Sequence, residues 1–98
     1  MNIQAMMKQA QKMQKEMLNT KEEIDKKIFE GKSSFVNVKV NGTKEVIEIK
    51  IEKESIESDE IEMLQDMLLV ALNEANKKVD KELEDKLGKY TQGMPGLF

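Results

Sequence analysis

The stretch VNVKVNGTKEVIEIKIE, residues 36–52, decides the fold class of this chain. Apolar residues alternate with polar ones on both sides of a central turn: Val36, Val38 and Val40 before it, and Ile47, Ile49 and Ile51 after it. Strict alternation is typical of strands that bury one face. Asn41-Gly42 is the dipeptide most favoured where a hairpin turn needs positive φ. The stretch therefore predicts a half-buried antiparallel hairpin.

Helical periodicity flanks the hairpin on both sides. Residues 2 to about 28 predict one long helix with an a/d-like seam, which Thr20 interrupts: Ile3, Met6, Ala10, Met13, Met17 and Ile24. Residues 59–87 predict a second helix, and Gly88 is placed to end it. The segment from Phe29 to Ser33 can supply a further strand, although its sequence barely marks one. We expect a single α+β domain over residues 1–88 and a flexible tail over residues 89–98.

The run MLLVAL, residues 67–72, is apolar on every side of the second predicted helix. A helix that is hydrophobic all round is buried on more than one face. One face can lie on the sheet, and the other needs a second partner. A symmetric homodimer supplies that partner with a self-complementary patch. We expect the dimer interface to include Met67, Leu68, Leu69, Val70 and Leu72.

Composition excludes several classes of function. Cys and His are both absent, so disulfides, the usual zinc ligands and the common nucleophile triads are missing. We therefore expect no enzyme activity, no metal, no cofactor and no small-molecule substrate. The chain has no segment that resembles a signal peptide, and its longest apolar run is too short to span a bilayer. These features predict a cytoplasmic protein without a membrane partner.

The opening stretch AMMKQAQKMQKEM, residues 5–17, allows three interpretations: a packing seam, a soft-metal site or a contact for nucleic acid. The metal interpretation is the weakest, because the methionines fall on the apolar stripe. Lys8, Lys12 and Lys15 share one helical face away from that stripe and can neutralise phosphates. Composition alone favours a solvated lysine face. The chain has no Arg for bidentate base contacts and few aromatic residues for stacking.

Charge is polarised along the chain. Residues 1–28 carry six Lys and four acidic residues, whereas residues 58–87 carry four Lys and nine acidic residues. The first predicted helix is therefore basic within a protein of net charge −3. Any phosphate contact should involve this helix, with modest, salt-sensitive affinity.

Four segments resemble the YbaB/EbfC family of bacterial nucleoid-associated proteins: MMKQAQKMQKEM, VNVKVNGTKEVIEIKIE, EMLQDMLLVALNEANKKV and GMPGLF. The resemblance implies a helix, three antiparallel strands and a second helix, paired into a tweezer-shaped homodimer whose first helices project as arms. It also implies binding of double-stranded DNA at the nucleoid with low sequence specificity, and an influence on gene expression. The basic positions of the matching amino-terminal motif are Lys8, Lys12 and Lys15, with Lys21, Lys26 and Lys27 as weaker candidates.

This sequence departs from the family pattern at GKSSF, where a Gly-rich stretch is common, and at EKES, where Asp-Pro is common. Neither departure touches the candidate lysines. The alternative function is a protein-interaction scaffold or a chaperone-like helical dimer without DNA binding, since two amphipathic helices around a hairpin also suit client contact. Catalysis is the third and least favoured hypothesis. The carboxylate pairs that could act in catalysis look like parts of the solvent-facing sides of a strand and a helix.

Overall fold

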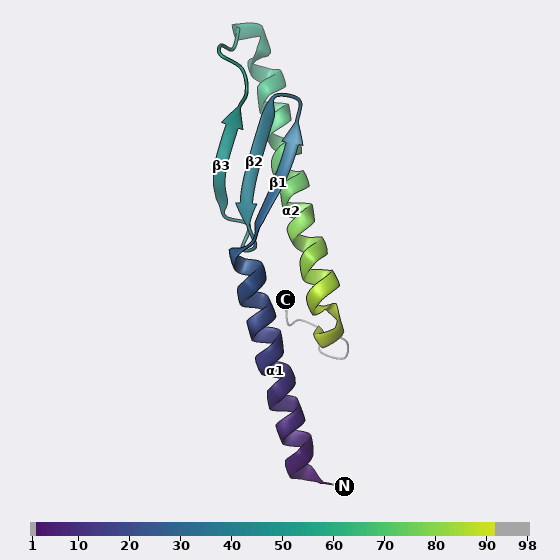
Figure 1. The fold of residues 1–98 in the computed structure, drawn as a ribbon. Helices are drawn as coiled ribbons and strands as arrows, with labels where there is room; N and C mark the ends of the chain where they lie inside the picture. Colours follow the sequence, from purple (N-terminus) through teal and green to yellow (C-terminus); the bar gives the residue numbers. More distant parts are fainter. Residues whose placement is uncertain (1, 92–98) are drawn as a thin grey trace.

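The computed structural model describes residues 2–91 and confirms the predicted α+β class (Figure 1). The elements follow one another as α1 (Ile3–Lys26), β1 (Ile28–Ser33), β2 (Val36–Asn41), β3 (Val46–Ile51), the short 3-10 turn η1 (Ser58–Glu60) and α2 (Ile61–Thr91). The weakly marked third strand exists and is β1. Helix α1 ends slightly earlier than expected, because Lys27 already has extended backbone angles and leads into β1.

The three strands form one antiparallel sheet in the order β1-β2-β3, which confirms the predicted antiparallel hairpin. The expected half-burial holds for β2 but was wrong for β3, where every residue is exposed. One register detail differs from the sequence pattern. A register shift beside Lys39 and Val40 pairs Val40 with Val46, whereas regular alternation would pair it with Ile47. A bulge inserts one unpaired residue and so changes which side chain shares the apolar face. Val46 therefore lies beside Ile49 on that face.

The turn between β2 and β3 also differs from the expectation for Asn41-Gly42. Lys44, with φ of 66°, takes the left-handed conformation. The Asn41 side chain closes this longer turn by accepting hydrogen bonds from the backbone N–H groups of Thr43 and Glu45 at 2.9 and 3.0 Å. Gly42 is needed for a different reason, because a Cβ there would lie 1.9 Å from the Ile24 carbonyl oxygen. The turn thus packs against the end of α1.

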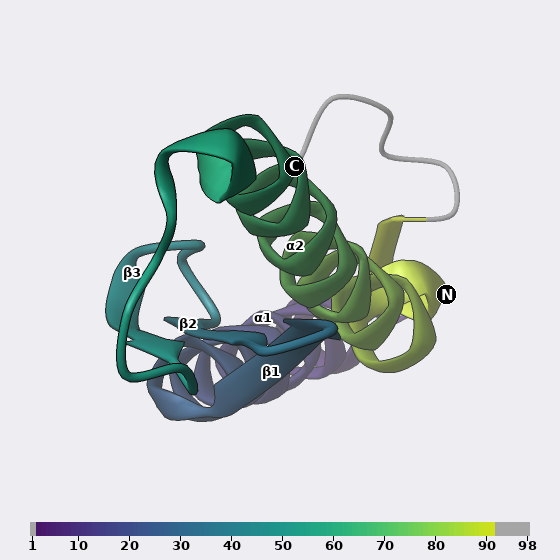
Figure 2. The same ribbon diagram turned by 90° about the horizontal axis from the view of Figure 1, so that it is seen from above.

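Helix α2 lies across one face of the sheet, closest to β1 and β2 (Figure 2). Three valines of β2 are fully buried beneath it: Val36, Val38 and Val40. The approach to β1 is very close, because a Cβ on Gly31 would lie 1.9 Å from the Ala71 carbonyl oxygen and 2.7 Å from the Ala75 nitrogen. Both alanines are fully buried. Small residues on both elements therefore set the distance between helix and sheet.

Helix α2 is longer than expected. Gly88 lies inside it, so the expectation that this glycine ends the helix was wrong. Leu87 is fully buried and Tyr90 packs against the core, which favours continuing the helix through the glycine. Residues 89–91 of the expected tail continue α2, and residues 92–98 lie outside the described residues.

The described chain is strongly elongated. Its principal extents are 71 × 21 × 14 Å and its radius of gyration is 19.3 Å. A compact domain of this length has a radius of gyration of about 13 Å. Much apolar surface is consequently exposed, both on α1 and on the α2–β3 side of the molecule.

The helix–sheet contact predicts that replacing two glycines of the chain by alanine has opposite effects on stability. Gly31→Ala should lower the free energy of unfolding by about 2–3 kcal/mol or more, because the new methyl group meets α2 backbone. Gly88→Ala is the matched control, since nothing lies within 4 Å of a Cβ there, and it should stabilise α2 by up to about 1 kcal/mol. Urea denaturation followed by circular dichroism, at one fixed protein concentration, measures both. Equal effects at the two sites would contradict this packing.

Candidate nucleic-acid interface

The amino-terminal part of α1 projects away from the rest of the protein (Figure 1). Asn2 caps the helix by accepting a hydrogen bond from the Ala5 N–H at 3.2 Å. Only the carboxyl-terminal part packs against the core, through buried Ile24 and partly buried Met17. Every residue from Asn2 to Glu16 is exposed. We call residues 3–15 the outer arm.

Four of the six candidate lysines share one face of α1, and they are Lys8, Lys12, Lys15 and Lys26. Their successive spacings of four, three and eleven residues lie close to whole turns of an α-helix. This face lies opposite the apolar seam, which leaves it open to solvent along the whole helix. Within residues 2–91, none of the four ammonium groups forms an ion pair.

The other two candidate lysines are held in ion pairs. Lys21 pairs with Asp25 one turn further along α1, and both side chains are about one-third exposed. Lys27 pairs with Glu82 of α2, whose carboxylate is largely buried. The structure therefore separates the candidates: Lys26 joins the face of Lys8, Lys12 and Lys15, whereas Lys21 and Lys27 serve local contacts.

Charge also varies along α1. The outer arm contains three lysines and no acidic residue. The remainder of the helix carries two lysines and four acidic residues: Glu16, Glu22, Glu23 and Asp25. Positive potential is therefore concentrated on the outer arm, and Glu16, next to Lys15, is the first acidic residue of the helix.

Four lysines of the sheet and its connections, Lys32, Lys39, Lys44 and Lys53, face acidic partners instead. Lys44 pairs with Asp80 at 2.7 Å, and Lys53 pairs with Glu60. The hydrogen bond from Lys53 lowers the pKa of Glu60. The Asn37 amide donates to Glu30 at 2.8 Å and lowers the pKa of that carboxyl. Both carboxylates remain ionised at neutral pH and can compensate neighbouring lysines.

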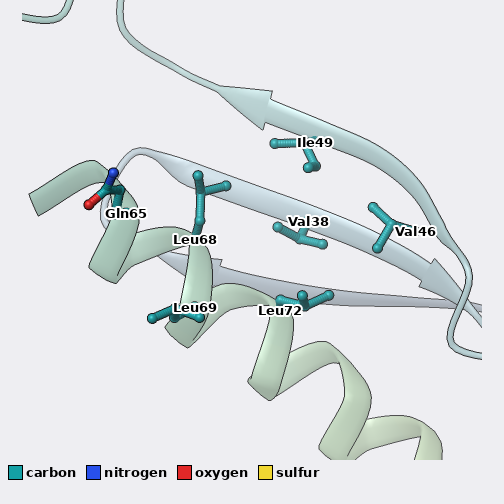
Figure 3. Close-up of a pocket in the computed structure, with 7 residues that line it drawn as sticks. All are labelled: Val38, Val46, Ile49, Gln65, Leu68, Leu69 and Leu72. Atoms are coloured by element: carbon teal, nitrogen blue, oxygen red, sulfur yellow. The ribbon is translucent and has the colours of Figure 1, made fainter. Parts of the chain in front are cut away.

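A second feature is an apolar groove of about 410 Å³ between the first half of α2 and β3 (Figure 3). Apolar side chains from three elements face one another around it, with Gln65 at its end: Val38, Val46, Ile49, Leu68, Leu69 and Leu72. Helix α2 makes no close backbone contact with β3 within the described residues, which leaves the groove open.

The groove includes part of the expected dimer interface. Met67, Leu68 and Leu72 are partly buried against the core, whereas Leu69 and Val70 are 60% and 54% exposed. MLLVAL thus packs on the sheet with one face and exposes the other. Sequence reasoning missed the contribution of β3, where Val46 and Ile49 line the groove. The alternation in VIEIKIE marked an apolar strand face but not the helix opposite it.

Two further properties of the described residues bear on function. Residues 2–91 contain no group of three or more His, Cys, Asp or Glu side chains that could hold a metal ion. Neither of the described helices has a stretch long and apolar enough to cross a lipid bilayer.

The fold and its charges define a small α+β protein with a projecting basic helix. Residues 1–94 match the model of the YbaB/EbfC DNA-binding family. A nucleoid-associated protein of Bacillus licheniformis is 50% identical over 101 residues, covering 99% of this chain and 94% of the relative. Another, from Ligilactobacillus salivarius, is 42% identical over 99 residues, covering 99% of this chain and 95% of the relative. The chain therefore belongs to the YbaB/EbfC DNA-binding family.

The neighbours Lys26 and Lys27 provide a matched test of which lysines are available to a polyanion. Lys26→Gln should weaken binding to a DNA duplex by about two- to five-fold, because it removes an ammonium group that has no acidic partner within residues 2–91. Lys27→Gln removes the same charge from a side chain already paired with Glu82, so affinity should change less. Fluorescence anisotropy with a labelled duplex measures both variants. A larger loss for Lys27→Gln would contradict the assignment.

Proposed function

We propose that this protein binds double-stranded DNA at the nucleoid, as a homodimer, through the lysine face of α1. The observation that carries the proposal is the outer arm, where three lysines project into solvent and no acidic residue occurs before Glu16. An α-helix bearing cations on one exposed face can follow the phosphates of a duplex. Membership of a DNA-binding family agrees with this geometry.

Low sequence specificity follows from the chemistry of the contacts. All basic residues of the chain are lysines. A lysine ammonium is a point charge that neutralises phosphate, whereas base identity is commonly read by bidentate side chains such as Arg. Contacts to phosphate position a protein but carry no sequence code. The proposed lysine contacts therefore recognise the phosphate backbone of the duplex and not its base sequence.

A second copy is the proposed occupant of the α2–β3 groove. Leu69 lines it and exposes apolar surface, and the isoleucines of β3 are exposed as well. Contiguous exposed apolar side chains of this kind mark protein–protein interaction sites. A C2 dimer covers identical patches on both subunits and projects two outer arms.

Salt dependence tests the DNA-binding proposal. Two arms with three lysines each would contact about six phosphates, so the logarithm of the binding constant should fall with the logarithm of salt concentration with a slope of about −5. The triple variant Lys8→Gln, Lys12→Gln, Lys15→Gln should lose at least about ten-fold in affinity and show a shallower slope. Anisotropy titrations on two unrelated duplexes should give similar constants.

The matched control removes three lysines that already have acidic partners: Lys32→Gln, Lys44→Gln and Lys53→Gln. Both triple variants have the same net charge, so an effect of overall charge would weaken them equally. Binding that survives in the outer-arm variant would remove the assignment of the interface. Absence of binding by the native protein at low salt would reject the function and favour the protein-interaction alternative.

The dimer has a separate test. The double variant Ile49→Gln, Leu69→Gln changes two exposed side chains that line the groove, so the monomer should stay folded while the dimer dissociates. Leu18→Gln, also an exposed apolar residue but on α1, is the control and should leave the dimer intact. Sedimentation equilibrium gives the mass of each species. A double variant that sediments like the native protein would exclude this face as the interface.

A further inference from the structure

The apolar seam of the outer arm has no role in the proposed DNA contact, because it lies opposite the lysines. Its members fall at alternating spacings of three and four residues, the a and d positions of a heptad: Ile3, Met6, Ala10 and Met13. Ile3, Met6 and Met13 are 69%, 55% and 45% exposed. The same seam continues into Met17 and Ile24, which pack against the core beside α2. The outer arm thus extends a helix-packing surface beyond the end of its own partner helix.

The residues that flank the seam favour a second copy of the same surface. The e and g positions of the outer arm are Met7, Gln14 and Gln9, all uncharged. Its three lysines fall at the c and f positions, which point away from a coiled-coil interface. No like charges would oppose pairing of two identical arms, and no fixed charge selects an oppositely charged protein.

We propose that the outer arm pairs antiparallel with the outer arm of a second copy from another dimer. A parallel partner would run into α2, which packs on α1 from about Met17 onward. An antiparallel partner enters from the free end, and its own body then lies beyond the amino terminus. In this register Ile3 faces Met13 and Met6 faces Ala10. A larger side chain then meets a small one in the central layers, and flexible methionines fill the remainder.

Paired arms would have a specific effect on DNA. The lysine faces lie opposite the seam, so two paired arms turn them outward in opposite directions, which suits two duplexes held side by side. About two heptads bury little surface and give weak pairing in free solution. Binding of several copies along DNA raises the effective concentration of neighbouring arms, and this increases the fraction of arms that are paired. The inference therefore rests on the proposed DNA binding and adds a bridging activity to it.

A bridging assay tests this inference with the full chain. One duplex is fixed on beads, and capture of a second, fluorescent duplex is measured. The double variant Met6→Gln, Met13→Gln keeps helix propensity and charge while removing the apolar seam. Capture should fall by about five-fold or more. Anisotropy binding to a single short duplex should stay within about two-fold of the native protein, because the lysine face is unchanged.

Leu18→Gln is the matched control, because it replaces an exposed apolar residue of α1 outside the heptad seam. It should capture the second duplex as the native protein does. Full capture by the Met6→Gln, Met13→Gln variant would overturn arm pairing, as would an equal loss with Leu18→Gln. Native protein that binds a single duplex but captures no second one would also overturn it. Absence of single-duplex binding would instead reject the proposed function.

Discussion

The close approach of α2 to β1 is the constraint on which the rest of the structure depends. Gly31 lets the strand touch the backbone of α2 at Ala71 and Ala75, and neither element could come so near with larger side chains. The contact seals the valines of β2 beneath the helix. It also fixes the direction of α2 across the sheet. The helix contacts α1 but makes no close backbone contact with β3. The core is consequently concentrated on one side of the sheet, and two apolar surfaces remain at opposite ends of the molecule.

The same arrangement separates the charges. Acidic residues of α2 lie near lysines of the sheet and its turns, as in the pairs Lys27–Glu82 and Lys44–Asp80. Such pairs compensate the individual lysines but add little stability where they are exposed. Outside the outer arm the chain carries a net charge of −6, because the arm holds +3 of a total of −3. The outer arm lies beyond the reach of α2, so its lysines keep their full charge for a partner. A net negative protein can therefore present a local basic surface, which is the physical basis for the proposed DNA contact.

Local periodicity made much of this predictable. Alternation identified β2 and β3, and the heptad-like spacing identified both α1 and the face that carries Lys8, Lys12 and Lys15. Features that depend on distant contacts were not readable: the bulge beside Val40, the role of Gly31, and continuation of α2 through Gly88. The lysine candidates show the same limit, because the partner of Lys27 is 55 residues away in the chain. Spacing gives the face of a helix, but only the fold shows which charges are already compensated.

Backbone amide resonances offer the most direct measurement of where DNA binds. Lys8, Lys12 and Lys15 lie on the outer arm, whereas Met63 and Met67 lie on α2. Nitrogen-15 spectra of the labelled protein, recorded during titration with a short duplex, should show shifts or broadening at the amides of the three lysines that reverse on adding salt. The two α2 amides should stay unchanged in the same titration. Perturbation of Met63 and Met67 without change on the outer arm would contradict the assignment of α1 as the DNA-binding element.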